Sequence, residues 1–362
     1  MPTFQQRLYN LFANYPNYTA FSNEGWIPTD NNGTYDSIES LHDSIHTLGG
    51  GNFGHLSIIQ YSAFDPLFML HHVNVDRLFA MWQVLYNDSY VTPMKAIYPS
   101  HTSAAGEMQD AGSPLTPFFA NSSTFWTSDT VRNHEVFGYT YAEVSSKNRS
   151  EVVTTINRLY THYSPATMSI GRKRRRSMGY GDTIVTDGSS DQKDIHHRSL
   201  HLPVNAIFDG GNDYYEWIAN IHVNKHALNG SFLIHMFLGP VPPDPSTWSI
   251  ARNSVGSLGV FAHSWPHEGM KQQQIAGTIP MTSALMDAIA TGKIASLRPD
   301  HVEPFLKAWI NVRISLLTET IVDPEEVDGL GISIVSSRVK APSSEDHLTK
   351  WGEVTSHFDL IK

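Results

Sequence analysis

A group of histidines between residues 42 and 72 limits the possible folds of this chain more than any other feature. His42 and His46 are four residues apart, so on a helix they project from one face with their Cβ atoms about 5–6 Å apart, close enough to share a metal ion. A third histidine on a second helix would complete a three-imidazole site. Neutral imidazole suits copper, zinc, iron and nickel, and three protein ligands leave one position open for chemistry. Such a pair also occurs on solvated helix faces, so the spacing alone does not decide between the two.

A second helix is predicted from Pro66 onward, in the block DPLFMLHHVNVDR at residues 65–77. Proline suits the first turn of a helix, because its missing N–H has no intrahelical partner there. Apolar residues then recur and predict a broad buried stripe. They are Leu67, Leu70, Leu78, Phe79, Met81, Trp82 and Leu85. The first helix is capped by Asp36 or Ser37 and is stopped by the glycines at 49–51.

The same block resembles the second copper-binding segment of the type-3 copper proteins, which are the tyrosinases, catechol oxidases and molluscan-type haemocyanins. The pattern of that segment is Asp-Pro-x-Phe, an apolar residue, two further positions, a ligand histidine, three positions and then Asp, so the matching ligand is His72. His42 and His46 match the upstream ligand pair, and glycine-rich sequence follows them as in fungal members. The resemblance implies a copper ion held by these three histidines, with His71 as a neighbour rather than a ligand.

Four further residues lie around the expected ligands. Phe68 matches the family aromatic that packs over a ligand ring, although a plain core residue is the alternative. Asp76, one turn beyond the second-helix ligand, is expected to orient an imidazole or to pair with an arginine, in either a functional or a purely structural contact. Glu39 matches a glutamate that helps to hold a water near the phenol proton, and a solvated surface residue is the alternative. Asp43 stands where many phenol-hydroxylating members carry Asn, which puts monophenolase activity in doubt but not diphenol oxidation.

The family binds two coppers, and the first needs three histidines on helices far upstream. Only 41 residues precede His42, and none of them is histidine. His222 and His226 have the right spacing, but they lie in an alternating, strand-like run, where residues four apart stand roughly 13 Å apart. The chain therefore resembles a tyrosinase without its first copper segment. Its opening residues look like a helix from the middle of a domain, which favours a truncated chain with ligands for one copper.

The composition narrows the possible partners. At 362 residues the chain fits two domains, and its net charge of −10 argues against nucleic acid. It contains no apolar run long enough to cross a bilayer and no signal peptide at its start, which favours an intracellular location. It has no cysteine, so it forms no disulfide and no Cys–His thioether of the kind fungal relatives form in the absent segment.

Two boundaries divide the sequence. Residues 1–144 are predicted to form a partial tyrosinase copper-binding domain of helical-bundle type, ended by a motif that contains Tyr139 and Tyr141. Residues 145–204 are predicted to be a flexible linker, because they contain the basic run at 172–176 followed by Gly- and Ser-rich sequence. Such a run between two domains is also a candidate cleavage site.

Residues 205–362 show short alternating runs separated by Gly, Pro and Asn turns, which predict an antiparallel β-sandwich with helices at 282–291 and 299–308. The overall fold class is therefore α+β and multidomain. This part resembles the C-terminal domain of fungal tyrosinases, which covers the copper site in the latent enzyme. A bulky residue of that domain enters the substrate cavity, and Phe261 is the matching position.

The leading hypothesis is a tyrosinase-like copper oxidoreductase that converts phenols and o-diphenols to o-quinones with O₂, in pigment synthesis of the melanin type. The alternatives are a non-catalytic copper-binding or regulatory protein, and a mononuclear zinc hydrolase. The expected partners are a small phenol and O₂, with either a homo-oligomer or an additional N-terminal segment, and neither nucleic acid nor membrane.

Overall fold

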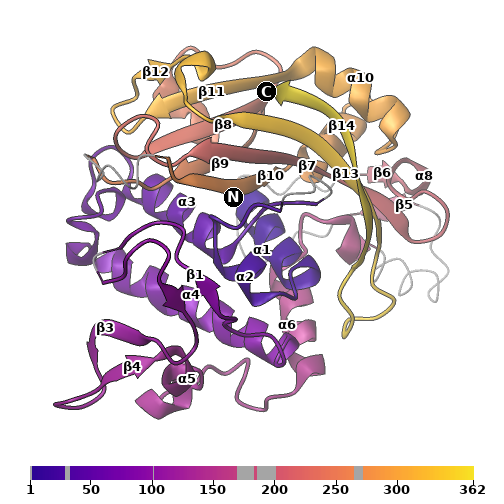
Figure 1. Cartoon of the computed structure of the whole chain (residues 1–362). Helices are drawn as coiled ribbons and strands as arrows, with labels where there is room; N and C mark the ends of the chain where they lie inside the picture. The colour runs from indigo at the N-terminus through magenta and orange to yellow at the C-terminus, as the bar shows by residue number, and fades with distance from the viewer. Residues whose placement is uncertain (1, 29–32, 101, 169–182, 186–200, 265–271) are drawn as a thin grey trace.

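The computed structural model describes residues 2–28, 33–100, 102–168, 183–185, 201–264 and 272–362. Within them the chain forms a helical region and, in contact with it, a sandwich of two antiparallel sheets (Figure 1). The predicted α+β class with a C-terminal β-sandwich is therefore confirmed. The basic run at 172–176, predicted as a cleavage site, lies outside the described residues.

The helical region surrounds one apolar core. Its helices are α1 (Pro2–Asn14), α2 (Tyr18–Ser22), α3 (Ile38–Gly50), α4 (Pro66–Leu85), α5 (Ser128–Val131) and α6 (Arg149–Tyr160). Trp82 of α4 is fully buried in this core and stacks on Phe21 of α2 with ring centroids 4.6 Å apart. Its indole N–H donates to the carbonyl of Tyr15 at 2.8 Å. These contacts hold the C-terminal half of α4 against the chain's first two helices.

The ends of α3 and α4 follow the sequence signals. Ser37 caps α3 by accepting a hydrogen bond from a backbone N–H one turn on, and Gly51 ends the helix with φ of 56°. Asp65 caps α4 by accepting from the N–H of Leu67 at 3.0 Å, and Pro66 occupies the first turn. Both helices that carry the histidines therefore begin where the sequence predicts, and α3 also ends at the predicted glycines.

The sandwich consists of two four-stranded antiparallel sheets, in the orders β10-β7-β13-β14 and β12-β11-β8-β9. The strands are β7 (Asp213–Asn224), β8 (Phe232–Leu238), β9 (Ser254–Val260), β10 (Gln274–Pro280), β11 (Ile310–Leu316), β12 (Ile321–Val322), β13 (Gly331–Lys340) and β14 (Lys350–Ile361). One apolar core joins the two sheets, with Ile221 of β7 and Ile234 of β8 among its fully buried members. The alternating runs in the sequence therefore predict the sheets correctly.

Helices interrupt the sandwich near the predicted positions, as α9 (Thr282–Ala290) and α10 (Pro299–Trp309), and α8 (Val204–Ile207) precedes it. Short strand pairs complete the described chain. They are β1 (Met94–Lys95) with β2 (Met108–Gln109), β3 (Pro114–Phe119) with β4 (Phe125–Thr127), and β5 (Thr183–Val185) with β6 (His201–Pro203). The first two pairs come between α4 and α6 in the sequence, and β3 and β4 project from the helical region below α4 (Figure 1).

The predicted linker at 145–204 begins too early, because its first part is a packed helix. On α6 the side chains of Val152 and Ile156 are buried in the helical core. Asn157 donates through Nδ2 to the carbonyl of Glu345, in the loop between β13 and β14, at 2.7 Å. This segment therefore joins the two parts of the molecule rather than separating them.

The predicted buried stripe of α4 is wrong for its first half. Leu67 is 49% exposed and Leu70 is 69% exposed, whereas Leu78, Met81 and Leu85 are buried. The apolar pattern continues along the whole helix, but only its second half has the helical core to pack against.

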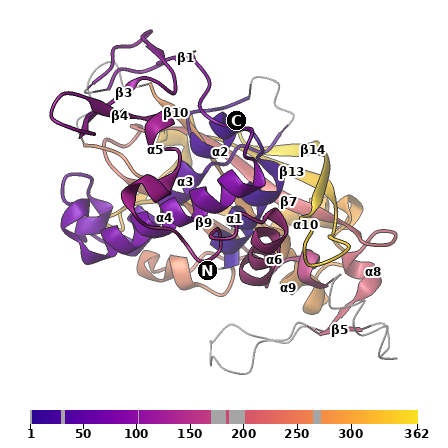
Figure 2. The same cartoon turned by 90° about the horizontal axis from the view of Figure 1, so that it is seen from below.

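The helical region meets the sandwich along α3, which lies next to β9 in both views of the cartoon (Figures 1 and 2). Glycines on the strands allow a close approach. A Cβ at Gly259 would lie 1.9 Å from Oγ1 of Thr47, and one at Gly277 would lie 2.4 Å from Oγ of Ser40. The N–H of Gly259 donates to Oγ of Ser44 at 3.1 Å. The polar side of α3 is thus buried by the sandwich, which its sequence pattern does not reveal.

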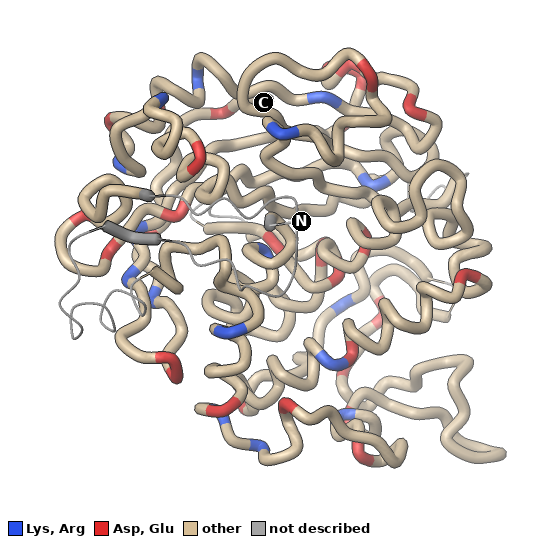
Figure 3. The backbone as a smooth tube through the Cα atoms, turned by 180° about the vertical axis from the view of Figure 1, so that it is seen from behind, with Lys and Arg blue, Asp and Glu red and all other residues tan. Residues whose placement is uncertain are grey.

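Acidic and basic residues are interspersed over both parts of the described backbone (Figure 3). Among the described residues, no helix combines the length and the apolar character that crossing a bilayer requires. Because charges of both signs are mixed over the backbone, no large region of the described backbone carries a single sign of charge, and the ionic contacts described below are local pairs.

Candidate metal centre

Four histidines meet where α3 passes the first half of α4. One ring nitrogen from each of His42, His46, His71 and His72 lies within 4.8 Å of those of the others. Three of these nitrogens are closer still. Nε2 of His42 is 3.0 Å from Nε2 of His46 and 3.3 Å from Nε2 of His72, and the last two are 3.2 Å apart. The structure therefore brings together the three histidines predicted as ligands.

The opposite ring nitrogens fix the tautomers of the two α3 histidines. Nδ1 of His46 lies 2.8 Å from the carbonyl oxygen of Leu56, which can only accept, so Nδ1 carries the proton and Nε2 carries a lone pair. Nδ1 of His42 lies 2.9 Å from Oδ1 of Asp43. Burial would raise the pKa of Asp43, but Lys225 and His42 outweigh it and lower the pKa, so this carboxylate also accepts.

When both rings are neutral, two lone pairs face each other across 3.0 Å, and neither nitrogen can donate to the other. A cation between them satisfies both. An ion about 2.0–2.1 Å from each nitrogen in tetrahedral geometry places its ligands about 3.3–3.4 Å apart, close to the separations of the three Nε2 atoms. The histidines present thus fit a bound metal ion of the kind that prefers imidazole.

Three of the four histidines, His46, His71 and His72, are held in the neutral form that binds a metal ion. Burial, with the neighbouring imidazoles, lowers the pKa of His71 to about 3 and that of His72 to about 4, and burial lowers the pKa of His46. Metal ions bind imidazole without its second proton, so these shifts favour binding near neutral pH.

His71 belongs to the same group but differs in its contacts. Its ring stacks on that of His42, with centroids 5.0 Å apart and planes at 17°. Its Nε2 is buried and has no hydrogen-bond partner within the part of the chain that the structure describes. It offers a fourth nitrogen beside the three that converge. Its expected place as a neighbour rather than a ligand stays a prediction.

Aromatic rings cover two of the histidines. Phe68 of α4 stacks on His72 at 4.0 Å between centroids, with planes at 25°. Phe261, just after β9, stacks on His46 at 4.4 Å, with planes at 12°. Phe68 thus lies over the ring of His72, and Phe261 places a side chain of the sandwich directly on the histidine group.

An ionic cluster lies beside His42, in which Glu24 and Asp43 are buried and Glu39 is exposed. The ammonium of Lys225, at the end of β7, pairs with Glu24 and also lies 3.0 Å from Oδ2 of Asp43. Oε2 of Glu39 accepts from the N–H of Glu24 at 2.9 Å. Burial would lower the pKa of Lys225, but the three carboxylates outweigh it and raise the pKa, so the lysine is charged. Sequence reasoning missed Lys225 and Glu24, since neither lies near His42, His46 or His72 in the chain.

Asp76 does not have the predicted partner. Its Oδ2 accepts from the hydroxyl of Tyr139 at 2.7 Å and from that of Tyr141 at 2.6 Å, rather than from an imidazole or an arginine. The neighbouring Arg77 pairs with Glu143 instead. The carboxylate therefore fastens the tyrosine motif to α4 and has no contact with the histidine group among its described hydrogen bonds.

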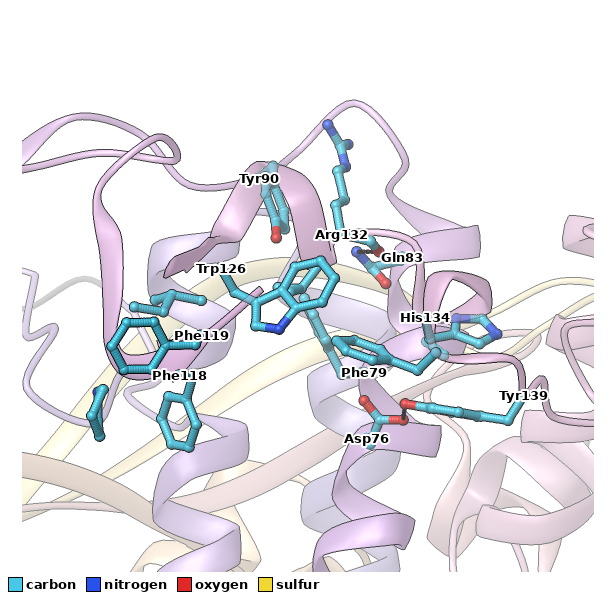
Figure 4. Close-up of a pocket in the computed structure, with 15 residues that line it drawn as sticks. Asp76, Phe79, Gln83, Tyr90, Phe118, Phe119, Trp126, Arg132, His134 and Tyr139 are labelled. Carbon is cyan, nitrogen blue, oxygen red and sulfur yellow. Dashed lines mark hydrogen bonds between the residues drawn. The ribbon is translucent and has the colours of Figure 1, made fainter. Parts of the chain in front are cut away.

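A cavity of about 570 Å³ lies on a different face of α4, and none of its lining residues belongs to the histidine group. Figure 4 shows it among the rings of Phe79, Phe118 and Trp126, with the hydrogen-bonded pair of Asp76 and Tyr139 at one side. Its lining is largely aromatic and also includes Asp76, Arg132 and His134.

Two family profiles match the chain. The profile described as the common central domain of tyrosinase matches residues 2–85, which contain all four histidines of the group. The profile described as the tyrosinase C-terminal domain matches residues 216–334, which contain Lys225 and Phe261. The two matches correspond to the helical region and the sandwich.

Curated relatives support the same family. A tyrosinase of Neurospora crassa is 30% identical over 91% of this chain and 59% of its own length. A tyrosinase of Podospora anserina is 33% identical over 79% of this chain and 56% of its own length. The chain thus spans less than two thirds of the length of either relative.

A solved structure of mushroom tyrosinase in latent and active forms has the same fold, with a TM-score of 0.72 and 21% identity over 99% of this chain and 61% of that one. Sequence, fold and the histidine group agree. The chain belongs to the tyrosinase family.

Proposed function

We propose that this chain is part of a copper oxidoreductase of the tyrosinase type, which oxidises phenols and o-diphenols to o-quinones with O₂. One observation carries the proposal: Nε2 of His42 and Nε2 of His46 lie 3.0 Å apart, while Nδ1 of each ring faces an oxygen that can only accept. Copper is the metal that the tyrosinase relatives favour, and when bound it supplies the electron transfer between phenol and O₂. Pigment synthesis of the melanin type is the role this implies.

The residues of the chain have separate parts in this proposal. His42, His46 and His72 hold the copper, and their Nδ1 contacts orient the first two. Phe68 fixes the ring of His72 by stacking. Glu39, held by the N–H of Glu24, is proposed to accept the phenol proton through a water.

Phe261 is proposed to restrain substrate access. Its ring lies flat on His46, and it is largely buried. A phenol ring stacked on that histidine would need the same space. The chain would therefore be latent with the sandwich in place, and Phe261→Ala is expected to increase access to the copper.

The described residues supply ligands for one copper, because the histidine group is the one cluster among them with three or more metal-binding side chains in reach of each other. The oxidation by O₂ in this family uses two coppers, so the chain by itself is expected to bind copper and to oxidise catechols weakly or not at all. The same observation favours a second candidate, a non-catalytic copper-binding or regulatory protein.

Metal content and oxygen uptake together test the proposal. The purified chain is loaded with copper or zinc, dialysed, and assayed for retained metal and for oxygen consumption with a simple catechol. We expect about one copper per chain, preferred over zinc, and little turnover. Failure to retain copper would overturn the metal centre, and a preference for zinc would favour the zinc hydrolase. Strong turnover abolished by a chelator would show that a second copper site forms in the assembled protein.

A further inference from the structure

We propose that Lys225, in the C-terminal sandwich, is a positioning residue for the metal centre: its ammonium holds the Asp43 carboxylate against Nδ1 of His42 and so fixes the tautomer and direction of that ligand. The inference rests on the proposed metal role of the histidine group. It assigns the sandwich a second effect on the centre, besides the cover provided by Phe261.

Hydrogen bonds connect Lys225 in the sandwich to His42 in the helical region through the carboxylate of Asp43. Nζ of Lys225 donates to Oδ2 of Asp43 at 3.0 Å, and the other oxygen of the same carboxylate, Oδ1, accepts from Nδ1 of His42 at 2.9 Å. The Asp43 side chain is 4% exposed, so water has little access to replace either partner. Nε2 of His42 then points at the nitrogens of His46 and His72.

Lys225 is itself held in place. It follows β7 directly, and its N–H donates to the carbonyl of Gln273 at 2.8 Å, next to β10. Its ammonium also pairs with Glu24 of the helical region. A side chain anchored at its backbone and at two carboxylates has little rotational freedom left, so it can hold Asp43 in one orientation.

The two α3 histidines differ in how their tautomers are set. His46 donates to a backbone carbonyl, that of Leu56, which is uncharged and fixed by the chain. His42 donates to a side-chain carboxylate that lies beside another buried carboxylate, Glu24. Without the ammonium between them, these two like charges would repel, and Asp43 would turn away from His42. The orientation of His42 therefore depends on Lys225 in a way that the orientation of His46 does not.

The test compares copper binding in matched variants. Lys225→Met removes the charge and keeps the length, whereas Lys225→Arg keeps a cation that can reach the carboxylates. The control is Lys307→Met, which breaks an exposed ion pair with Glu303 on α10. The copper dissociation constant is measured by competition with a chelator, and the Cu(II) electron paramagnetic resonance spectrum reports the geometry of the ligands.

We expect Lys225→Met to weaken copper binding about tenfold to a hundredfold, as loss of a contact to a ligand's second nitrogen does elsewhere, and to change the spectrum. Lys225→Arg should keep most of the copper affinity and most of the original spectrum, and Lys307→Met should match the unsubstituted chain in both. The effect of Lys225→Met on copper binding should also vanish when Asp43→Asn is already present, because the side chain beside Nδ1 of His42 then carries no charge for the ammonium to hold. A merely structural lysine would lower the melting temperature without these changes in the spectrum.

A folded Lys225→Met variant with unchanged affinity and spectrum would overturn the inference while leaving the metal centre intact. Should Lys225→Met fail to fold, Lys225→Gln gives the same test, since its amide removes the charge and still donates. Failure of the unsubstituted chain to bind copper would instead overturn the proposed function and this inference together.

Discussion

The helices α3 and α4 each bring histidines to the same point, yet their surroundings differ. α3 is covered on both sides: Leu41 packs in the helical core, and Thr47 lies fully buried under the sandwich. The first half of α4 has no such cover, since Met69 and Val73 are more than half exposed. One half of the metal centre is therefore positioned by two parts of the molecule, and the other half by one.

This difference shows that a repeated apolar pattern predicts a helix better than it predicts what covers the helix. Both helices have apolar residues at helical spacing, and both form as expected. Whether each apolar residue is buried depends on segments far away in the sequence. The comparison can be tested by substitutions that should act strongly on α3 and weakly on the first half of α4.

Paired leucine substitutions should give the largest contrast. Leu41→Ala in α3 removes a buried side chain, so we expect it to lower the free energy of unfolding by about 3 kcal/mol. Leu70→Ala in α4 removes an exposed one and should change it by less than about 0.5 kcal/mol. Denaturant unfolding followed by circular dichroism measures both. Equal losses would show that the first half of α4 is covered after all.

Gly259→Ala should test the contact between α3 and the sandwich. The added Cβ would meet Oγ1 of Thr47 at 1.9 Å and Cα of Ser44 at 2.9 Å, so helix or strand must move. We expect a loss of about 2 kcal/mol. The control is Gly112→Ala, which places its Cβ at an ordinary contact distance in an exposed turn. Gly292→Ala would not serve as a control, because Gly292 has a positive φ. Equal melting temperatures for Gly259→Ala and Gly112→Ala would contradict the close packing of α3 against β9.

The contact between α1 and the sandwich should depend on pH through Glu216. Burial raises the pKa of this β7 carboxyl to about 8, although hydrogen bonds to Thr282 and Asn10 oppose the shift. The folded chain keeps a proton that the unfolded chain releases above about pH 4.5, so stability falls as pH rises from there towards 8. Glu216→Gln should remove this loss, which amounts to about 4 kcal/mol at pH 8 and to less than about 1 kcal/mol at pH 5. A gain that does not depend on pH would mean that the carboxyl is not buried as a neutral acid.

The sequence predicted the parts of the centre that follow from local pattern. The spacing of His42 and His46, together with the match of His72 to a family motif, was enough to predict that their ring nitrogens lie close together. Phe261 was found through the resemblance alone, because nothing in its own neighbourhood marks it as facing a histidine. Asp43 was singled out through the resemblance as well, but its partner was not.

Long-range contacts account for what the sequence did not predict. Lys225 lies 182 residues from Asp43, and no periodicity or motif links them. Asp76 was expected near an imidazole because of its helical spacing. Instead, its carboxylate accepts hydrogen bonds from Tyr139 and Tyr141, which lie more than 60 residues further along the chain. In α6, the apolar residues at 152, 153 and 156 have helical spacing, and the basic sequence further along the predicted linker obscured that signal.

Copper affinity measured across a histidine series tests the central claim most directly. The series comprises the unsubstituted chain, His46→Ala and His72→Ala, with His347→Ala as a control at an exposed histidine in the loop between β13 and β14. His71→Ala is added to decide whether the fourth imidazole contributes.

The account predicts about one tightly bound copper in the unsubstituted chain and in His347→Ala, loss of that copper after dialysis in His46→Ala and His72→Ala, and a much smaller loss in His71→Ala. Unchanged copper in His72→Ala would contradict the centre assigned to α3 and α4.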